Sequence, residues 1–206
     1  MITIIDYGAG NLTSISNMLK RIGEESEITN EIEKIAVATK LILPGVGSFN
    51  FGMNQLRNAP YFEILCKKVQ QEKTPLLGIC LGMQLLGEGS EEGVVTGLGW
   101  IKGKVKKFDS EKVQKAGLKI PHMGWTDIQI NKPSKILQDL PPDAHFYFVH
   151  SYHLTPADPQ DILLTSNYGY NFTSAVEKDN IVAVQFHPEK SHKYGMQLYR
   201  NFARLY

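Results

Sequence analysis

The sequence predicts an α/β fold in which a mostly parallel sheet is covered by helices. Two observations support this prediction: short apolar segments alternate with helical patterns through the first half of the chain, and a β-rich second half follows. The β-α-β-α-β-α order favours parallel strands joined by helical crossovers. The strands predicted in the first half are residues 2–5 (ITII), 40–47 (KLILPGVG) and 74–79 (TPLLGI).

The first predicted strand ends at the glycine-rich segment DYGAGN, and a helical pattern follows it. Apolar side chains recur there every three or four residues, which is the spacing of one face of a helix. Gly23 supplies a stop signal after the last of them. The apolar positions of this helix are Leu12, Ile15, Leu19 and Ile22.

The second and third units repeat this order. Residues 40–47 form an apolar strand that runs into the turn PGVG, and residues 53–72 have a helical pattern. Residues 74–79 form the third strand, and residues 83–89 (MQLLGEG) indicate the start of another helix. Each strand is short and apolar, as expected for strands buried on both faces.

The second half of the chain predicts further strands, because β-branched and aromatic residues dominate it. Leu198, Phe202 and Leu205 mark a last helix. No repeat, low-complexity tract or change of composition divides the sequence, so we expect one domain, residues 1–206, whose second half completes the central sheet. The strand-like segments are 97–108, 145–152, 162–168, 172–178 and 181–187.

The composition argues against several classes of protein. A chain of 206 residues that is 42% hydrophobic can bury a substantial core. The formal net charge of +1 gives no basic field, so we expect no nucleic-acid partner. No apolar run approaches the roughly 20 residues of a membrane span, and no signal peptide is evident, so we expect no membrane association. Two cysteines form no disulfide framework, which favours a reducing compartment and a cytoplasmic location.

The segment PLLGICLGMQLL (75–86) places Cys80 between two glycines. The cysteine follows a predicted strand and precedes a helical pattern, so it lies at a turn where helix N–H groups favour a thiolate. Gly78 and Gly82 fit a nucleophile elbow, because small neighbours allow a tight turn and a close approach of substrate. The N–H of Leu81 would then be one oxyanion donor. Cys80 is therefore the candidate nucleophile.

The segment VQFHPEKS (184–191) supplies the groups that such a nucleophile needs. His187 ends an apolar strand, and Glu189 follows two residues later, with a proline between them that fixes the turn. A cysteine nucleophile requires a base, and the base requires a group that orients it. The sequence thus predicts a relay in which Cys80 attacks, His187 transfers protons and Glu189 orients the imidazole.

Three other patterns have weaker support as functional sites. Cys66 lies on a helical pattern and is predicted to be a core residue. HSYH (150–153) offers two possible metal ligands, but few other Cys or His residues lie at ligand spacing, so we expect no metal. GAGN (8–11) lacks the third glycine of a dinucleotide fingerprint.

Ordinary structural roles remain the alternative for Cys80 and His187.

Four motifs, in this order along the chain, resemble those of the class I (triad) glutamine amidotransferases: PGVGSF, GICLGMQLL, FVHSY and QFHPEKS. The combination of GICLGMQ with HPE is highly specific for this superfamily, and the resemblance covers nearly the whole chain. It implies a class I glutamine amidotransferase-like (flavodoxin-like) three-layer fold. It also implies hydrolysis of L-glutamine to glutamate and ammonia through a cysteinyl thioester, with no cofactor.

The resemblance also assigns residues around the nucleophile. Val46 or Gly47 of the PGVG turn would supply the second oxyanion donor, and a Pro/Gly turn after a strand does present backbone N–H groups. Gln84 and Gly47 would hold the substrate, together with the backbone at Ser151 and Tyr152. For Ser151 and Tyr152, packing at a strand edge remains the alternative.

Two further motifs, DYGAGNL and IPHMGW, resemble a subset of the family that passes ammonia to a separate polypeptide. The implied partner is a (β/α)8 cyclase subunit that makes imidazole glycerol phosphate in histidine biosynthesis, and the implied assembly is a heterodimer. Apolar side chains at the interface would act as anchors. The alternative for these apolar side chains is core packing, and the alternative for the lysine is an ordinary solvated side chain. The interface residues that the resemblance implies are Asn11, Met123, Trp125 and Lys190.

Departures from this subset leave the partner open. Thr126 follows PHMGW where asparagine is common, and Trp100 and Lys102 stand where smaller or apolar residues are more usual. One alternative is a paralogous glutaminase that supplies ammonia to another synthetase, for example in sugar amidation. A non-catalytic subunit and a stand-alone cysteine hydrolase are further alternatives, but the intact triad opposes the former, and Gln84 with the PGVG turn opposes the latter.

Control of the reaction is a further expectation. Ammonia made without an acceptor is wasted, so we expect low activity in the isolated chain. The PGVG loop is rich in glycine and close to the nucleophile, and is therefore a candidate switch that completes the oxyanion hole when the partner docks.

Overall fold

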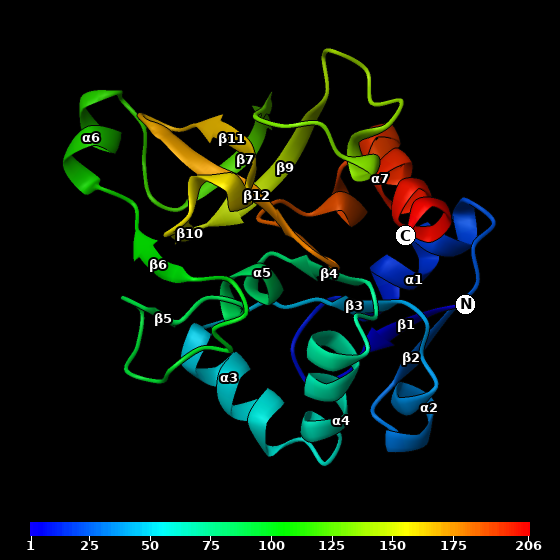
Figure 1. Cartoon of the computed structure of the whole chain (residues 1–206). Coiled ribbons are helices and arrows are strands. Elements are labelled where there is room, and N and C mark those ends of the chain that lie inside the picture. The colour runs from blue at the N-terminus through cyan, green and yellow to red at the C-terminus, as the bar shows by residue number, and fades with distance from the viewer.

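The computed structural model describes residues 1–206 and has a central sheet of eight strands (Figure 1). Five neighbouring strands run parallel, and three antiparallel strands extend one edge. This arrangement confirms the prediction of a mostly parallel sheet with a β-rich addition. In spatial order the strands are β2 (Ser26–Thr29), β1 (Ile2–Ile5), β3 (Leu41–Leu43), β4 (Leu76–Ile79), β13 (Ile181–Val184), β12 (Asn171–Lys178), β11 (Ile162–Asn167) and β8 (Gln129–Ile130).

Helices cover both faces of the parallel part of the sheet, which gives three layers. Helices α1 (Leu12–Arg21) and α7 (His192–Leu205) pack into one buried apolar cluster, with Leu19 and Leu198 among its members. The helices α2 to α5 bury their apolar side chains in a second cluster on the opposite face (Figure 1). Their bounds are Ile32–Ala36, Phe49–Asn58, Phe62–Cys66 and Leu81–Leu85.

The longest helix, α7, has 14 residues. Among the helices of the chain, none combines the length and the apolar character that crossing a membrane requires.

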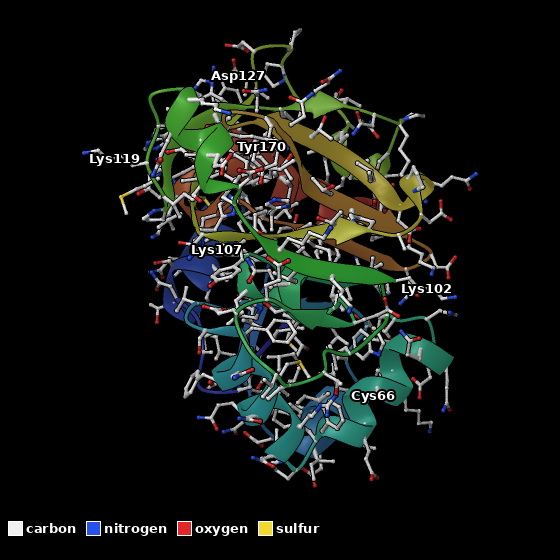
Figure 2. All side chains as sticks on the ribbon, turned by 90° about the vertical axis from the view of Figure 1, so that its left-hand side faces the viewer. Cys66, Lys102, Lys107, Lys119, Asp127 and Tyr170 are labelled. Carbon is white, nitrogen blue, oxygen red and sulfur yellow. The ribbon has the colours of Figure 1, made fainter.

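Two small sheets stand apart from the central one, which corrects the expectation that the second half only completes it. The chain changes sheets at Ser151, so the segment 145–152 contributes to two strands instead of one. In the turned view of Figure 2, Lys107 and Tyr170 lie on this part of the molecule and Cys66 lies in the helical layer below. The first small sheet contains β10 (Tyr152–Pro156), β6 (Gly103–Lys107) and β5 (Gly89–Ser90), and the second contains β7 (His122–Asp127) and β9 (His145–His150); α6 (Ser110–Lys115) follows β6.

The structure also differs from the expected elements at several places, three of which have identifiable reasons. The helical pattern of 53–72 is broken because Ala59 precedes Pro60, which disfavours the helical conformation, and Ala59 is extended with ψ 135°. The residues after the break form α4 and a π-helix over Lys67–Gln71. Strand β2 and α2 were not expected, because an edge strand with a half-exposed, mixed sequence has little apolar pattern. The helix expected from Met83 starts two residues earlier, at Leu81.

Glycines allow α5 to lie directly against the ends of the central strands. A Cβ on Gly82 would stand 1.9 Å from the carbonyl oxygen of Leu43, and a Cβ on Gly78 would stand 2.9 Å from the Cβ of Ala183. Since the obstacle at Gly82 is backbone of β3, no rotamer change can relieve it. The residue between these glycines, Cys80, is therefore held at the edge of the sheet by close backbone packing.

We expect the substitution Gly82→Ala to destabilise the protein by about 1–3 kcal/mol, because an added methyl group must displace either α5 or β3. Gly89→Ala is the matched control, since a Cβ at Gly89 meets nothing within 4 Å; its effect should stay within about 0.5 kcal/mol. Urea unfolding of the two variants measures both free energies. Equal stability of the two variants would contradict this account of the elbow.

Candidate active site

Cys80 occupies a sharp turn between β4 and α5. Its backbone has φ +53° and ψ −109°, a conformation that residues other than glycine rarely adopt. The Cys80 N–H donates a hydrogen bond of 2.8 Å to the carbonyl oxygen of Val184 on the neighbouring strand. Strained backbone of this kind persists where the surrounding packing determines it, and it is common at reactive residues. The predicted nucleophile elbow is thus present in the geometry of the turn.

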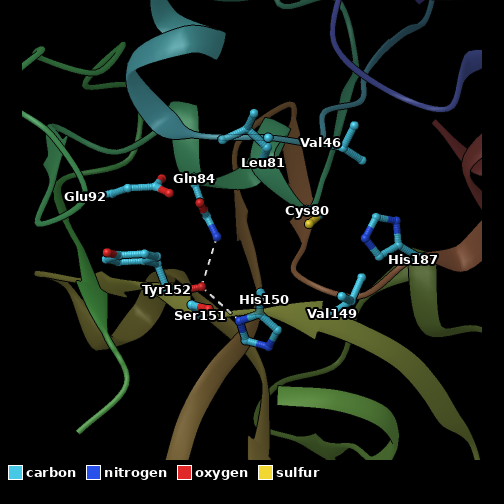
Figure 3. A pocket seen from close by; sticks show the side chains of 11 residues that line it. Val46, Cys80, Leu81, Gln84, Glu92, Val149, His150, Ser151, Tyr152 and His187 are labelled. Atoms are coloured by element: carbon cyan, nitrogen blue, oxygen red, sulfur yellow. Dashed lines mark hydrogen bonds between the residues drawn. The ribbon is translucent and has the colours of Figure 1, made fainter. Parts of the chain in front are cut away.

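His187 comes to Cys80 because their strands are neighbours. β4 and β13 are parallel, and Ile79 pairs with Val184, so both chains leave the sheet at the same edge. The His187 N–H donates to the carbonyl oxygen of Tyr147 at 2.9 Å, which ties this segment to β9. The sheet register thereby places the imidazole beside the sulfur (Figure 3).

Glu189 is held against the imidazole by a short helical turn over Pro188–Lys190. Its Oε1 lies 2.7 Å from His187 Nδ1, and only 3% of its side chain and 2% of that of His187 are exposed. A carboxylate in this position fixes the ring and leaves His187 Nε2, which has no protein partner, available at the pocket. The three residues predicted as a relay therefore lie together.

The electrostatics of the site keep His187 charged at neutral pH. Burial disfavours the imidazolium and lowers its pKa, but the interactions with Cys80 and Glu189 outweigh burial and raise the pKa of His187 to about 10. The same carboxylate also affects the neighbouring Tyr199. Burial and then the Glu189 carboxylate raise the pKa of the Tyr199 hydroxyl well above 10. A charged imidazole beside a thiolate is the arrangement that a cysteine nucleophile requires.

A pocket of about 310 Å³ opens beside the sulfur (Figure 3). It draws on five parts of the chain: the turn after β3, the elbow, the segment between β5 and β6, the junction of β9 with β10, and the segment after β13. Every predicted substrate and oxyanion residue borders it. Its lining consists of Val46, Gly47, Cys80, Leu81, Gln84, Glu92, Val149, His150, Ser151, Tyr152 and His187.

Gln84 has a fixed orientation in this pocket. Its Nε2 donates to the carbonyl oxygen of Tyr152 at 2.9 Å and to Oε1 of Gln185 at 3.1 Å. Both neighbours are acceptors, so the amide nitrogen must point toward them and Oε1 is left as a free acceptor. Gln84 thus offers an oxygen to a positively charged group such as an α-ammonium.

Sequence reasoning assigned no role in this pocket to three of its residues, and it considered one of them, His150, only as a metal ligand. Gln185 is fully buried, and its Nε2 lies 3.6 Å from Cys80 Sγ as a donor to the sulfur. Glu92 borders the pocket while its Oε2 accepts from the N–H of Phe49 at 2.7 Å. His150 borders the pocket through strand β9. Gln185 lies only two residues before His187, and this closeness was the one signal that could have identified it.

The turn after β3 is anchored from below by Tyr7. The Tyr7 hydroxyl donates to the carbonyl oxygen of Pro44 at 2.5 Å, and burial, reinforced by the nearby Cys80, raises the pKa of Tyr7 far above 10. Gly47 has φ +106°, a conformation suited to glycine, and 46% of Val46 is exposed. The turn is therefore held by a hydrogen bond at Pro44, while Val46 and Gly47 at its tip are exposed.

The four predicted interface residues lie outside the pocket. Met123 is 61% exposed and Trp125 43% exposed, which opposes the alternative of core packing. Trp125 stacks on His192 with ring centroids 5.4 Å apart, and Lys190 Nζ lies 5.6 Å from the ring centre of Tyr147. Asn11 is exposed and caps α1, since its side chain accepts from the Ser14 N–H at 3.4 Å.

The remaining candidate residues have structural surroundings. Cys66 is half-buried at the end of α4, and burial raises the pKa of its thiol. His150 and His153, considered as metal ligands, are buried in an aromatic cluster around Phe108. Each makes its own hydrogen bond: His150 Nδ1 with the Tyr152 carbonyl oxygen, and His153 Nε2 with the Tyr170 hydroxyl.

Comparison with known proteins adds a family and a set of relatives. The family model described as Glutamine amidotransferase class-I matches residues 3–205. The chain is similar to imidazole glycerol phosphate synthase subunit HisH 2 of Methanococcus maripaludis, with 54% identity over 204 residues that cover 99% of each chain. It is 48% identical over 205 residues to subunit HisH 2 of Pseudomonas aeruginosa and 43% identical over 205 residues to subunit HisH of Leptospira interrogans, with all of each chain covered.

Solved structures share the fold at lower identity. A chain of PurLQS from Thermotoga maritima matches with a TM-score of 0.73 and 18% identity, covering 98% of this chain and 96% of that one. A glutamine amidotransferase matches with a TM-score of 0.73 and 19% identity, covering 100% and 98%. These matches confirm the predicted three-layer fold class.

We expect the substitution Glu189→Gln to lower the pKa of His187 from about 10 toward its ordinary value of 6.5, because one of the two groups that stabilise the imidazolium is lost. In the native protein the charged His187 contributes stability that is fully present below pH 6.5 and is lost as pH rises toward 10. The variant should therefore show a weaker decline of the free energy of unfolding over that range. An NMR titration of the His187 ring measures the pKa directly, with exposed Glu33→Gln as the control; an unchanged titration would refute the role given to Glu189.

Proposed function

The chain belongs to the class-I glutamine amidotransferase family, and on that premise we propose that it is the glutaminase subunit of an imidazole glycerol phosphate synthase. In this role it hydrolyses L-glutamine to glutamate and ammonia and delivers the ammonia to a cyclase subunit. The observation that carries the reaction is the buried Cys80–His187–Glu189 arrangement beside a pocket of about 310 Å³. The full-length likeness to subunits of this synthase supports the choice of partner.

In the first half of the reaction the Cys80 thiolate attacks the side-chain carbonyl carbon of glutamine. The carbonyl π electrons move onto oxygen, which would be stabilised by the Leu81 N–H and by an N–H of the turn at Val46 and Gly47. Collapse of this intermediate breaks the C–N bond, and the His187 imidazolium gives its proton to the leaving nitrogen. Ammonia departs and a glutamyl thioester remains on Cys80.

The second half returns the enzyme to its starting state. Neutral His187 takes a proton from water, and the water oxygen attacks the thioester carbon. Collapse of this second intermediate breaks the C–S bond and restores the thiolate beside a protonated imidazole. The released carboxyl group loses its proton to water, and glutamate leaves. Glu189 holds the ring in one orientation through both halves.

The amino-acid end of glutamine would be bound at the opposite side of the pocket. The free Oε1 of Gln84 and the carboxylate of Glu92 are both acceptors, which suits the α-ammonium group of glutamine. The backbone at Ser151 and Tyr152 would hold the same end of the substrate from the β9–β10 junction. Glutamine thereby spans the pocket with its amide at Cys80.

The cyclase would dock on the surface that carries Met123, Trp125, Asn11 and Lys190. Trp125 is an exposed aromatic side chain on a strand whose partner strand also borders the pocket. Aromatic residues of this kind commonly anchor protein interfaces. Ammonia is mostly protonated in neutral water, so a partner sealed over this edge would keep it in its reactive form.

A second candidate is a glutaminase that supplies a different amidating synthetase. Trp100 and Lys102 depart from the expected subset, and Lys102 is exposed at one edge of the molecule (Figure 2). Recovery of a synthetase other than the cyclase, when the native complex is purified, would favour this candidate over the histidine pathway.

We expect glutamate release from glutamine to be slow for the isolated chain and to rise roughly 100-fold to 1,000-fold with the cyclase subunit, if docking completes the oxyanion hole. Cys80→Ala should abolish release in both conditions, whereas Cys66→Ala should retain it. A glutamate assay with and without the cyclase and its nucleotide substrate measures both effects. Release that survives Cys80→Ala would refute the thioester mechanism.

We expect Trp125→Ala to weaken binding of the cyclase by about 2 kcal/mol or more, which is roughly 30-fold in Kd, because a central aromatic anchor is lost. Val94→Ala is the control, since Val94 is 95% exposed and lies on another segment. Calorimetric titration with the cyclase measures both affinities. Equal affinities of the two variants would place the docking surface elsewhere.

A further inference from the structure

A chain of hydrogen bonds joins the inner side of β7 to the glutamine pocket. His122 Nε2 lies 2.8 Å from the Thr126 hydroxyl, and His122 Nδ1 lies 3.1 Å from His150 Nε2. His150 Nδ1 in turn lies 2.8 Å from the carbonyl oxygen of Tyr152. His122 and His150 are register partners in the β7–β9 ladder, so the strand pairing itself brings the two rings together.

Each bond in this chain has a defined direction. The Tyr152 carbonyl can only accept, so His150 Nδ1 carries the hydrogen. Burial lowers the pKa of His150 well below 6.5 and that of His122 to about 4, so both rings are neutral at pH 7. His150 Nε2 is therefore an acceptor and His122 Nδ1 is its donor. His122 Nε2 is then left as an acceptor, and the Thr126 hydroxyl donates to it.

The surrounding rings hold His122 in place. Tyr168 stacks on one side with ring centroids 4.0 Å apart, and Phe148 stacks at 4.8 Å. His122 is also only 1% exposed, so its ring cannot turn toward water. Thr126 is the one hydrogen-bond donor that the structure gives to its Nε2.

The far end of the chain acts on the substrate site. The Tyr152 carbonyl accepts from His150 Nδ1 and from Gln84 Nε2 at the same time (Figure 3). With two donors on one oxygen, the peptide between Tyr152 and His153 is fixed in direction. This peptide fixes the amide of Gln84, and hence the position of the Gln84 Oε1 that faces the substrate.

We propose that Thr126, His122 and His150 are positioning residues for the glutamine site: the Thr126 hydroxyl on His122 Nε2 keeps the hydrogen of His122 on Nδ1, and this supports the His150 tautomer that anchors the Tyr152 carbonyl and, through it, Gln84. The proposal rests on the proposed glutaminase function. It assigns a role to Thr126, where the sequence departs from the more common asparagine: its hydroxyl points inward to His122, while Met123 and Trp125 on the same strand are exposed.

The test is Thr126→Val, which keeps the shape of the side chain and removes the hydroxyl. With the protein in complex with the cyclase, KM for glutamine should rise roughly fivefold, the size of one lost buried hydrogen bond, while kcat changes less than twofold. Thr126→Ser restores a hydroxyl and should return KM toward the native value. Thr155→Val is the matched control, a half-buried strand threonine outside the chain of bonds.

A second readout is independent of activity. Histidine nitrogen NMR of the free protein should show His150 with its hydrogen on Nδ1, and a shift toward the Nε2–H tautomer in Thr126→Val but not in Thr155→Val. A native KM and an unchanged His150 tautomer in Thr126→Val would overturn the proposal, as would a fall in kcat at constant KM. Failure of the proposed function would show differently, as native complex that releases no glutamate while the tautomer change still occurs.

Discussion

The pairing of β4 with β13 at the centre of the sheet is the constraint on which the site depends. Parallel neighbours end at the same edge, so the register of Ile79 with Val184 brings two segments a hundred residues apart in sequence into contact. The Cys80 N–H to Val184 bond then fixes the elbow to the strand that leads to His187. Ligand sites at the carboxyl ends of such strands are general in open α/β sheets. Here the same edge also receives the turn after β3, so the nucleophile, base and oxyanion loop have one common support.

Close packing of backbone turns this common support into a rigid one. A Cβ on Gly45 would stand 2.4 Å from the Tyr7 hydroxyl and 2.8 Å from the Leu81 Cβ, so the segment after β1, the oxyanion turn and α5 meet without room for a side chain at Gly45. Rigid surroundings of this kind are what allow Cys80 to keep a positive φ. The strain is thus a consequence of three elements packed at one point, and it holds the buried Cys80 at the wall of the pocket.

The sequence allowed the triad to be predicted because its signals are local. Two glycines flank Cys80, and a proline links His187 to Glu189 within three residues. Gln185 and His150 could not be found in the same way, since the contact of Gln185 with Cys80 spans 105 residues and depends on strand order. Periodicity predicted strands but gave no order among them, so the separate β7–β9 sheet was not foreseen. The break at Ala59, in contrast, follows from the proline beside it and was available from the sequence.

One histidine of the pocket, His187, is charged, and another, His150, is neutral. This difference explains how one site can use one histidine for proton transfer and the other for holding the substrate-binding backbone. His187 is charged because Cys80 and Glu189 compensate for its burial. His150 has no carboxylate beside it; burial lowers its pKa first, and the neighbouring His122, His153 and His187 lower it further. A positive charge on His150 would compete with His187 for the thiolate. A charged His150 would also carry a hydrogen on both ring nitrogens, so it could not accept from His122. Because His150 stays neutral, it can accept from His122 on one side and donate to the substrate-binding peptide on the other.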